Sequence, residues 1–278
     1  MTNSFPHIDT NSTLKDIQKE EPKYKFAIST VGIKNFKLPI FIVTKDDGIQ
    51  HTVANIHGYV DLDADKKGIN MSRIPIGLQK FINKRLDMEL ISDIAKHIRL
   101  KSEAQSCQLI YEFPYFIQKT APVSKETGLV NYNVVFDVFH NCEKTTHKMS
   151  VTITGMSLCP CSKEISEGQG AHCQRSKIRI ECIPCNNDEF IWIEDIIRIG
   201  EESCACPIFS VLKRFDEKFV TQFSYNNPYF VEDIARSCYY KLNHKENIEW
   251  FAIEVINEES IHQHDAYCKI EKDGVTYG

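Results

Sequence analysis

Two cysteines and a histidine lie close together in the stretch SLCPCSKEISEGQGAHCQRS, residues 157–176. Thiolate sulfur and imidazole nitrogen are ligands that zinc and similar divalent metals prefer in proteins. Cys159 and Cys161 are separated by one residue, and on a regular strand their side chains point to opposite faces. We therefore expect only one of them to bind a metal directly, together with His172. A disulfide between the two cysteines and plain structural packing are the alternatives.

A catalytic metal site needs a third protein ligand and an open position. Asp216 and Glu217, in the segment KRFDEKFV (213–220), are candidates for a carboxylate ligand, although a solvated charged turn is the simpler explanation of this pair. Glu259 and His262 follow an expected strand end. They are candidates for proton transfer, because a carboxylate and an imidazole can both be tuned towards neutral pH. An exposed polar turn is the alternative for these two residues.

The chain has eleven cysteines, which is a large number for its length of 278 residues. Reducing conditions keep cytosolic thiols free, so most of them are expected to be small buried side chains. Cys182 and Cys185, together with Cys204 and Cys206, would form a second metal clip only if their loops met in space. Nothing in the sequence shows that they do.

Composition excludes several classes of protein. The net charge of −5 argues against non-specific nucleic-acid binding. No apolar run is long enough to span a membrane, and residues 1–25 form a polar lead-in without a signal core, so a cytoplasmic protein is expected. An anionic ligand would need basic side chains such as Lys163 or Arg175, for which surface solvation is the default. The glycine motifs GxxxxGK[ST] and GxGxxG are absent.

The hydrophobic pattern predicts the same order of elements twice. In the first half, alternating apolar residues predict strands and a three- to four-residue spacing predicts two helices that break near Asp87. The expected ranges are strands at 26–43, 51–64, 109–117 and 134–138, with helices between 78 and 98. In the second half they are strands at 148–158, 176–183, 249–259 and 265–272, with helices over 189–203, 207–215 and 227–244. The repeated order suggests a duplicated module.

Several motifs together resemble those of the type IB GTP cyclohydrolases. They are SLCPCSKEIS…GAHCQRS, NMSRIP, VLKRFDEKFVT, NPYFVEDIAR and NEESIHQHDAY, and the similarity covers most of residues 27–272. The resemblance implies an α+β fold of two tandem tunnelling-fold modules, residues 26–145 and 146–278, each an antiparallel sheet with helices on one face. It also implies a homotetrameric toroid with active sites at subunit interfaces.

The implied reaction converts GTP and water to 7,8-dihydroneopterin triphosphate and formate, the first step of folate or pterin biosynthesis. Position by position, Cys159, His172 and Glu217 correspond to the ligands of one divalent metal, which is zinc, manganese or iron in this family. Cys159, Glu259 and His262 correspond to catalytic positions. The loop before His172 is one residue longer than the family pattern. Another tunnelling-fold enzyme acting on a purine or pterin, or a non-catalytic metal-stapled binding module, are the alternatives.

The same resemblance assigns the substrate contacts. Glu232 corresponds to the carboxylate that accepts hydrogen bonds from the guanine edge, and Lys163 and Arg175 are expected near the triphosphate. Cys161 corresponds to a second thiol beside the metal, able to form a disulfide with the cysteine ligand when the metal is absent. Gln222 stands where the family pattern has a glutamate, and it receives no role here.

Overall fold

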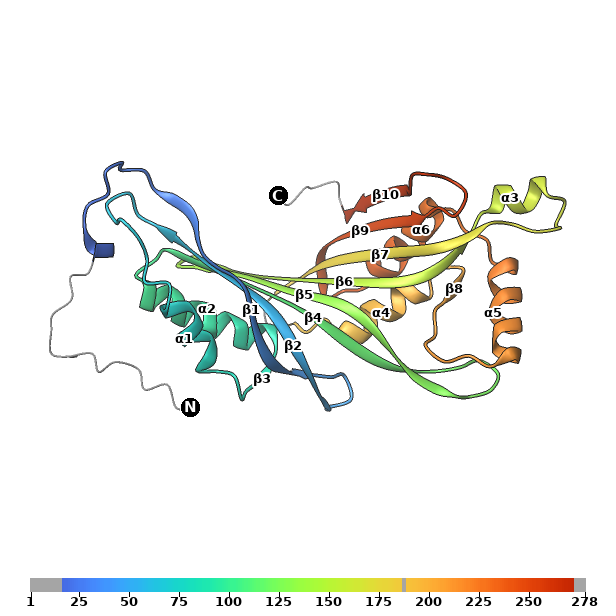
Figure 1. Ribbon diagram of the computed structural model, residues 1–278, viewed down its shortest axis with the longest axis horizontal. Helices are drawn as coiled ribbons and strands as arrows, with labels where there is room; N and C mark the ends of the chain where they lie inside the picture. The colour runs from blue at the N-terminus through green and yellow to red at the C-terminus, as the bar shows by residue number, and fades with distance from the viewer. Residues whose placement is uncertain (1–16, 187–188, 273–278) are drawn as a thin grey trace, which may run out of the picture.

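The structure, a computed structural model, describes residues 17–186 and 189–272. Within these residues, ten strands form one twisted sheet that is almost entirely antiparallel, as Figure 1 shows. The strand order is β10-β9-β7-β6-β5-β4-β2-β1-β3, and β8 pairs with β6. Most of the expected lead-in and the last residues of the expected second module, 273–278, lie outside the described residues.

In the first half, up to residue 145, the elements follow the order that the sequence pattern predicts. The helical region breaks at Asp87, whose side chain accepts a hydrogen bond of 2.7 Å from the backbone N–H of Leu90 and caps the second helix. The elements are η1 (Ile17–Lys19), β1 (Ile28–Val43), β2 (Ile49–Leu62), α1 (Arg73–Gln79), β3 (Arg85–Leu86), α2 (Met88–Ser102), β4 (Ser106–Thr120) and β5 (Thr127–Asn141).

The second half repeats the strand–strand–helix–strand–strand order with additional short elements. Its strands are β6 (Thr145–Leu158), β7 (Cys173–Pro184), β8 (Cys206–Pro207), β9 (Ile248–Glu258) and β10 (Ala266–Glu271). Its helices are α3 (Pro160–Ile165), α4 (Ile193–Glu201), α5 (Arg214–Asn226) and α6 (Val231–Asn243). The division into two modules stays a prediction, because the halves share one continuous sheet through the pairing of β5 with β6.

The helix expected over residues 207–215 is wrong. These residues form the short strand β8 and a loop, and α5 begins only at Arg214. The carboxylate of Asp216 explains this start, because its Oδ2 accepts a hydrogen bond of 2.8 Å from the backbone N–H of Lys213. The expected charged turn at Asp216 and Glu217 is accordingly the first turn of a helix.

One face of the sheet carries the core. Along β7, residues alternate strictly between buried and exposed over most of the strand. Figure 1 shows α1, α2, α4 and α6 on one side of the sheet. Their buried faces are largely isoleucine, alanine and leucine, each large side chain contributing about 1.5–3 kcal/mol through burial. Within the described residues, none of the helices has the length and apolar character that crossing a membrane would require.

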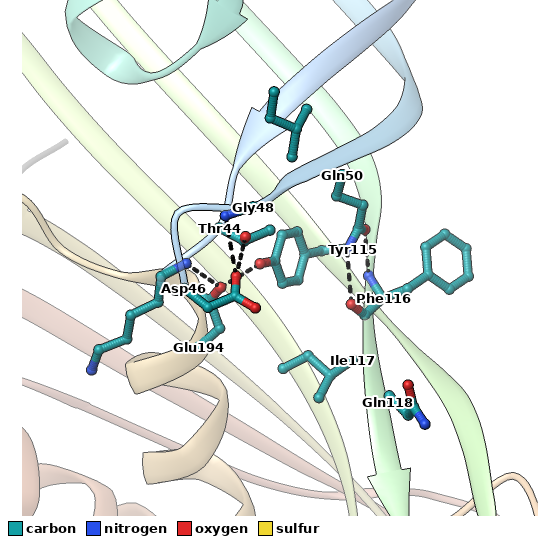
Figure 2. A pocket seen from close by; sticks show the side chains of 11 residues that line it. Thr44, Asp46, Gly48, Gln50, Tyr115, Phe116, Ile117, Gln118 and Glu194 are labelled. Carbon is teal, nitrogen blue, oxygen red and sulfur yellow. Dashed lines mark hydrogen bonds between the residues drawn. The ribbon is translucent and has the colours of Figure 1, made fainter.

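The strands β2 and β4 separate near the β1–β2 turn. Their backbone pairing ends at Asn55 and Glu112. Beyond that point the Gln50 side chain bonds both backbone groups of Phe116, donating over 2.8 Å and accepting over 2.7 Å (Figure 2). A cavity of about 610 Å³ lies at this opening, with Glu194 of α4 among its lining residues.

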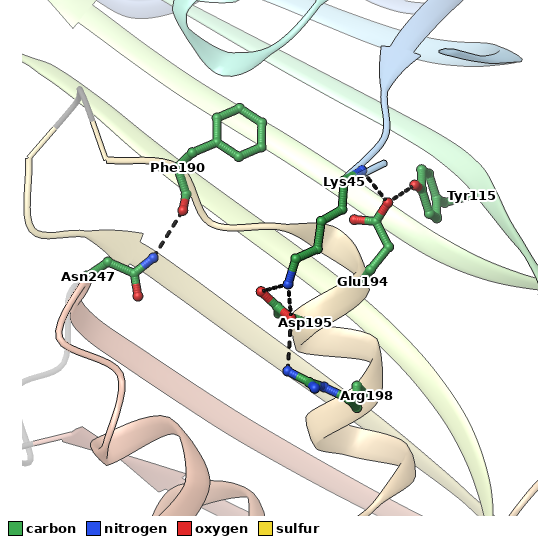
Figure 3. Close-up of polar contacts among 7 residues, drawn as sticks. All are labelled: Lys45, Tyr115, Phe190, Glu194, Asp195, Arg198 and Asn247. Carbon is green, nitrogen blue, oxygen red and sulfur yellow. Dashed lines mark hydrogen bonds and ion pairs between the residues drawn. The ribbon is translucent and has the colours of Figure 1, made fainter. Parts of the chain in front are cut away.

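Helix α4 of the second half is tied to the first half at the same place, as Figure 3 shows. Glu194 Oε1 accepts hydrogen bonds from the backbone N–H of Lys45, 2.9 Å away, and from the Tyr115 hydroxyl, 2.5 Å away. Lys45 Nζ also forms an ion pair of 2.6 Å with Asp195. Burial and the Glu194 carboxylate raise the pKa of Tyr115, so its phenol stays protonated and donates.

Candidate active site

Cys159 and His172 lie side by side at one end of the sheet. Cys159 follows the last residue of β6 and caps α3, whose first residue, Pro160, is well suited to that position. Its backbone N–H donates to the His172 carbonyl oxygen over 3.2 Å. Ser162 links the two residues further. Its N–H donates to Cys159 Sγ over 3.3 Å, and its hydroxyl accepts from the His172 N–H over 3.3 Å. The structure therefore brings together the two sequence-predicted metal donors.

Cys161 lies on the second residue of α3 and is exposed. Both Cys159 and Cys161 are free thiols, and no disulfide joins them in this structure. Cys161 lies two residues from Cys159, where a second thiol was expected. Its ability to form a disulfide with Cys159 stays a prediction.

The loop between α3 and β7 is fastened to the end of α5. Glu167 and Gly168 adopt positive φ angles of 53° and 78°, which make the bend tight. The Tyr225 hydroxyl donates to the Gly168 carbonyl oxygen over 2.6 Å. Lys163 Nζ donates to the Tyr225 carbonyl oxygen over 2.7 Å and lies 4.4 Å from the centre of the Tyr225 ring. The ammonium group predicted to meet a triphosphate is therefore engaged in holding this loop.

Glu259 belongs to the same group as His172. Its Oε2 lies 3.5 Å from His172 Nδ1, and the two side chains are mostly buried, with 11% and 13% of their surfaces exposed. Between them lies Gln174, whose Oε1 is 3.0 Å from His172 Nδ1 and whose Nε2 donates to Glu259 Oε1 over 3.2 Å. The sequence pattern gave no role to Gln174 or to Ser162. The alternation of β7 could have shown that Gln174 shares the buried face with Ser176.

Glu232 lies in the first turn of α6, close to the same end of the sheet. The backbone N–H of Tyr229 donates to the Leu158 carbonyl oxygen over 3.1 Å, which places the start of α6 beside the end of β6. Glu232 is exposed. Its charge also reaches β10, since burial and the Glu232 carboxylate raise the pKa of the Cys268 thiol while Arg236 lowers it.

His262 and Arg175 are less closely associated with this group. His262 is exposed in the connection between β9 and β10, where its ring stacks on that of His264 with centroids 5.1 Å apart. Arg175 is exposed and pairs across the sheet with Glu258. Because residues alternate along β7, it faces the opposite side of the sheet from Gln174.

Asp216 is a structural residue. It is fully buried, and its Oδ1 accepts hydrogen bonds from the backbone N–H groups of Val123 and Ser124 over 2.8 and 2.9 Å. Burial would raise the pKa of this carboxyl, but the hydrogen bonds from Ser124, Lys213 and Val123 outweigh burial and hold the pKa well below its ordinary value. Asp216 Oδ1 thus attaches α5 to the β4–β5 turn, while its Oδ2 caps the start of α5.

Glu217, the predicted third ligand, follows directly and is exposed. The end of α5 that touches α3 is at Tyr225, about 12 Å further along the helix axis at 1.5 Å per residue. The contact between α3 and α5 therefore does not bring Glu217 to the Cys159–His172 pair of the same chain. The assignment of Glu217 as a ligand stays a prediction.

The chemistry of the donor set suits a divalent metal. Cys159 and His172 are joined through their backbones, and Glu259 Oε2 is buried without a hydrogen-bond partner in the described part of the chain. Among the described residues, however, no group of three His, Cys, Asp or Glu side chains is arranged to hold a metal ion. Cys159 and His172 thus fit two positions of a metal site, and a single chain leaves the third position to be supplied.

The four additional cysteines do not form a second metal clip. Cys182 pairs with Met149 and Cys206 with Met156, positions that lie roughly 23 Å apart along β6. Burial raises the pKa of Cys206 to about 11, which keeps this thiol neutral. Cys204 is also buried and Cys185 is exposed at the far end of β7. The buried Cys182, Cys204 and Cys206 are structural side chains.

Sequence comparisons identify the family. The sequence model described as "Type I GTP cyclohydrolase folE2" matches residues 14–268. The chain belongs to the type I GTP cyclohydrolase FolE2 family. It is 40% identical over 260 residues to the GTP cyclohydrolase FolE2 of Thermosipho africanus, covering 94% of this chain and 98% of the relative. It is also 40% identical over 266 residues to that of Nitrosomonas eutropha, with 95% and 97% coverage. Membership in this family makes the chain an enzyme of this type. It excludes the alternative hypothesis of a non-catalytic metal-stapled binding module.

Solved structures place the FolE2 chain in the tunnelling fold. The uricase of Arthrobacter globiformis superimposes with a TM-score of 0.51 at 6% identity, covering 90% of this chain and 96% of the uricase. The urate oxidase of Bacillus subtilis 168 has a TM-score of 0.52 at 9% identity, with 87% and 98% coverage. At such identities the likeness concerns the fold alone, and the expected α+β class with a large antiparallel sheet is confirmed.

Proposed function

We propose that this FolE2 chain is a metal-dependent GTP cyclohydrolase that converts GTP and water to 7,8-dihydroneopterin triphosphate and formate in folate or pterin biosynthesis. The observation that carries this proposal is the group formed by Cys159, His172, Gln174 and Glu259, beside which helix α6 begins with Glu232. A cysteine joined to a histidine, a buried carboxylate beside that histidine, and a second carboxylate at the start of the neighbouring helix match the needs of a hydrolytic reaction on a purine ring.

In this proposal Cys159, His172 and Glu217 hold one divalent ion, zinc, manganese or iron. When bound, such an ion supplies Lewis-acid activation of water at neutral pH. Water adds at C8 of guanine and the C8–N9 bond breaks, which leaves a formamide on N7. A second water hydrolyses the C8–N7 bond of this formamide, which releases C8 as formate and leaves a free amine. The ribose then opens and rearranges to a ketone, and the freed amine condenses with this ketone to close the dihydropterin ring with loss of one water.

Glu259 and His262 are the proposed proton-transfer groups. The free Oε2 of Glu259 is supported in this role because it is buried and accepts no hydrogen bond among the described residues. His262 is exposed on the β9–β10 connection, a position from which an imidazole can exchange protons with solvent.

Glu232 is the proposed anchor of the base. A carboxylate can accept two hydrogen bonds from N1–H and the 2-amino group of guanine, an arrangement that adenine cannot reproduce. Its exposure leaves both oxygens accessible to substrate. Lys163 and Arg175 are proposed near the triphosphate, with Lys163 also fixing the neighbouring loop through Tyr225.

A homotetramer with interface active sites is part of the proposal. Helix α5 exposes a stripe of phenylalanines at a spacing of four residues, Phe215, Phe219 and Phe223, which is unusual for a surface without a partner. Glu217 is exposed on the same helix but on a different side from this stripe, so the second chain must pack around α5 to bring its own Cys159–His172 pair to Glu217. Such an arrangement would complete a site that one chain leaves with two metal donors.

The test is product analysis. The purified protein is incubated with GTP and, separately, with zinc, manganese or ferrous ions, and formate and the oxidised fluorescent pterin are measured. We expect both products with at least one metal, and neither after Cys159→Ala. Fluorescent pterin without formate would favour a different purine or pterin reaction. Absence of both products with every metal would overturn the proposal.

A further inference from the structure

Among the described residues, hydrogen bonds link the side chains of His172 and Glu259 only through the side chain of Gln174. Gln174 is the second residue of β7, and only 9% of its surface is exposed. Its Oε1 lies 3.0 Å from His172 Nδ1, and its Nε2 lies 3.2 Å from Glu259 Oε1. The direct distance from His172 Nδ1 to Glu259 Oε2 is longer, at 3.5 Å. The amide therefore lies between a predicted metal ligand and a predicted proton-transfer group.

The chemistry of the three groups fixes the direction of both hydrogen bonds. The NH2 end of the Gln174 amide donates to Glu259 Oε1, because a carboxylate oxygen without a proton accepts. The amide oxygen then faces His172 Nδ1 and can only accept. The Nδ1 atom must therefore carry a proton. In a neutral imidazole this leaves the lone pair on Nε2.

We propose that Gln174 is a positioning residue that holds His172 in the Nδ1–H tautomer, so that Nε2 is available to the metal, and keeps Glu259 from binding the imidazole itself. This inference rests on the proposed role of His172 as a metal ligand. A hydrogen-bonded partner on the remote nitrogen commonly orients a metal-binding histidine. Here a neutral amide fills that place, and the nearby carboxylate keeps its Oε2 free of protein hydrogen bonds in the described residues.

Two substitutions separate the two contacts. Gln174→Met has a similar volume and removes both hydrogen bonds. We expect the His172 ring then to lose its fixed orientation and its fixed Nδ1–H tautomer, and to compete for the Glu259 carboxylate. Gln174→Glu keeps an acceptor for the Nδ1–H but replaces the donor to Glu259 with a second carboxylate, and like charges repel. It should preserve the tautomer while disturbing Glu259.

The tautomer can be measured directly in the metal-free protein. Ring-15N-histidine protein is prepared, and the His172 signals are obtained by subtracting the spectrum of His172→Asn at about pH 8, where imidazoles are mostly neutral. We expect a protonated Nδ1 and an unprotonated Nε2 in the wild type and in Gln174→Glu. A protonated Nε2 in the wild type would overturn the inference.

Metal affinity and kinetics provide the second readout. Zinc binding, measured by competition with a chelator, should weaken by about 10- to 100-fold in Gln174→Met and less in Gln174→Glu. Both variants should lower kcat more than they change KM for GTP. Gln118→Met, an exposed glutamine on β4, is the matched control and should change none of these quantities. Unchanged zinc affinity in a folded Gln174→Met protein would also contradict the inference.

These readouts separate this inference from the proposed function. The tautomer and the zinc affinity require no turnover, so a wild type that releases no formate would overturn the cyclohydrolase proposal while leaving the positioning role to be decided by spectra and chelator. If Gln174→Met fails to fold, Gln174→Glu decides through the retained tautomer and a reduced kcat. A normal kcat in Gln174→Glu would then overturn the role in freeing Glu259.

Discussion

The backbone N–H of Tyr229 donates to the carbonyl oxygen of Leu158 over 3.1 Å, so helix α6 begins directly beside the residue that precedes Cys159. This bond joins two segments that are about 70 positions apart in the chain. It brings the first turn of α6, with the exposed Glu232, to the end of β6 where the thiol and imidazole lie.

Glu232→Gln should weaken GTP binding while leaving the metal site intact. The neutral amide retains one acceptor but loses the charge that strengthens two hydrogen bonds to guanine, so we expect KM for GTP to rise about 10- to 100-fold. Steady-state kinetics at saturating metal measure this. Glu249→Gln, on the exposed face of β9, is the control and should leave KM unchanged. A Glu232→Gln enzyme with wild-type KM would remove the anchor from the proposal.

Cys159→Ser and Cys161→Ser should differ sharply in metal content. Serine at position 159 keeps the size of the side chain but replaces a soft sulfur ligand, whereas Cys161 is an exposed neighbour on α3. We expect zinc per chain to fall from about one to near zero in the first variant and to stay near one in the second. Metal analysis after gel filtration gives the ratio. Equal loss of metal in both variants would mean that Cys161 is itself a ligand.

Mixing Glu217→Ala and Cys159→Ala chains tests whether one site uses two chains. Each variant alone should be inactive. If Glu217 acts on the Cys159–His172 pair of another chain, co-refolded one-to-one mixtures should recover about a quarter of the wild-type sites, because random assembly combines two intact contributions at that frequency. Formate release and metal content measure the recovery. If mixed oligomers recover no activity, Glu217 either acts on the Cys159–His172 pair of its own chain or does not belong to the site.

Asp216→Asn should destabilise the fold in a pH-dependent way. Since hydrogen bonding lowers the folded pKa of Asp216 below the ordinary 3.8, its charge contributes stability above that value. The contribution is lost as pH falls through the lowered folded pKa. The difference between wild type and variant in the urea concentration at the midpoint of unfolding should therefore be largest near neutral pH and should shrink in acid.

Urea unfolding at a series of pH values measures this difference. Asp65→Asn, which changes an exposed carboxylate, is the control and should show little difference at any pH. A difference that is constant from neutral pH into strong acid would show that the charge of Asp216 is not what fastens α5 to the β4–β5 turn.

Patterns local in sequence predicted most elements of the fold. Strand alternation and helical spacing are set by neighbouring residues, and the break at Asp87 depends on a cap three residues from its partner. The helix expected at 207–215 failed because α5 starts where Asp216 caps the backbone N–H of Lys213. The same carboxylate is fixed by Val123 and Ser124, which lie in another part of the chain.

The candidate site was likewise predictable only in part from the sequence. Cys159 and His172 could be recognised as a pair from their types and spacing, and the structure joins them. Gln174 could not be recognised, since an amide has no distinctive chemistry until its two neighbours are known. Glu217 was assigned from the motif, and the single chain leaves it exposed at the start of α5.

The attachment of α5 and α4 to the first half bears on how this chain can change over evolution. The Asp216 carboxylate depends on the main chain at Val123 and Ser124, and Glu194 depends on Lys45 and Tyr115. Residues outside the candidate site thus constrain the positions of both helices. A hybrid in which the second half of this chain is joined to the first half of a distant relative should fold poorly unless these partners are exchanged with it.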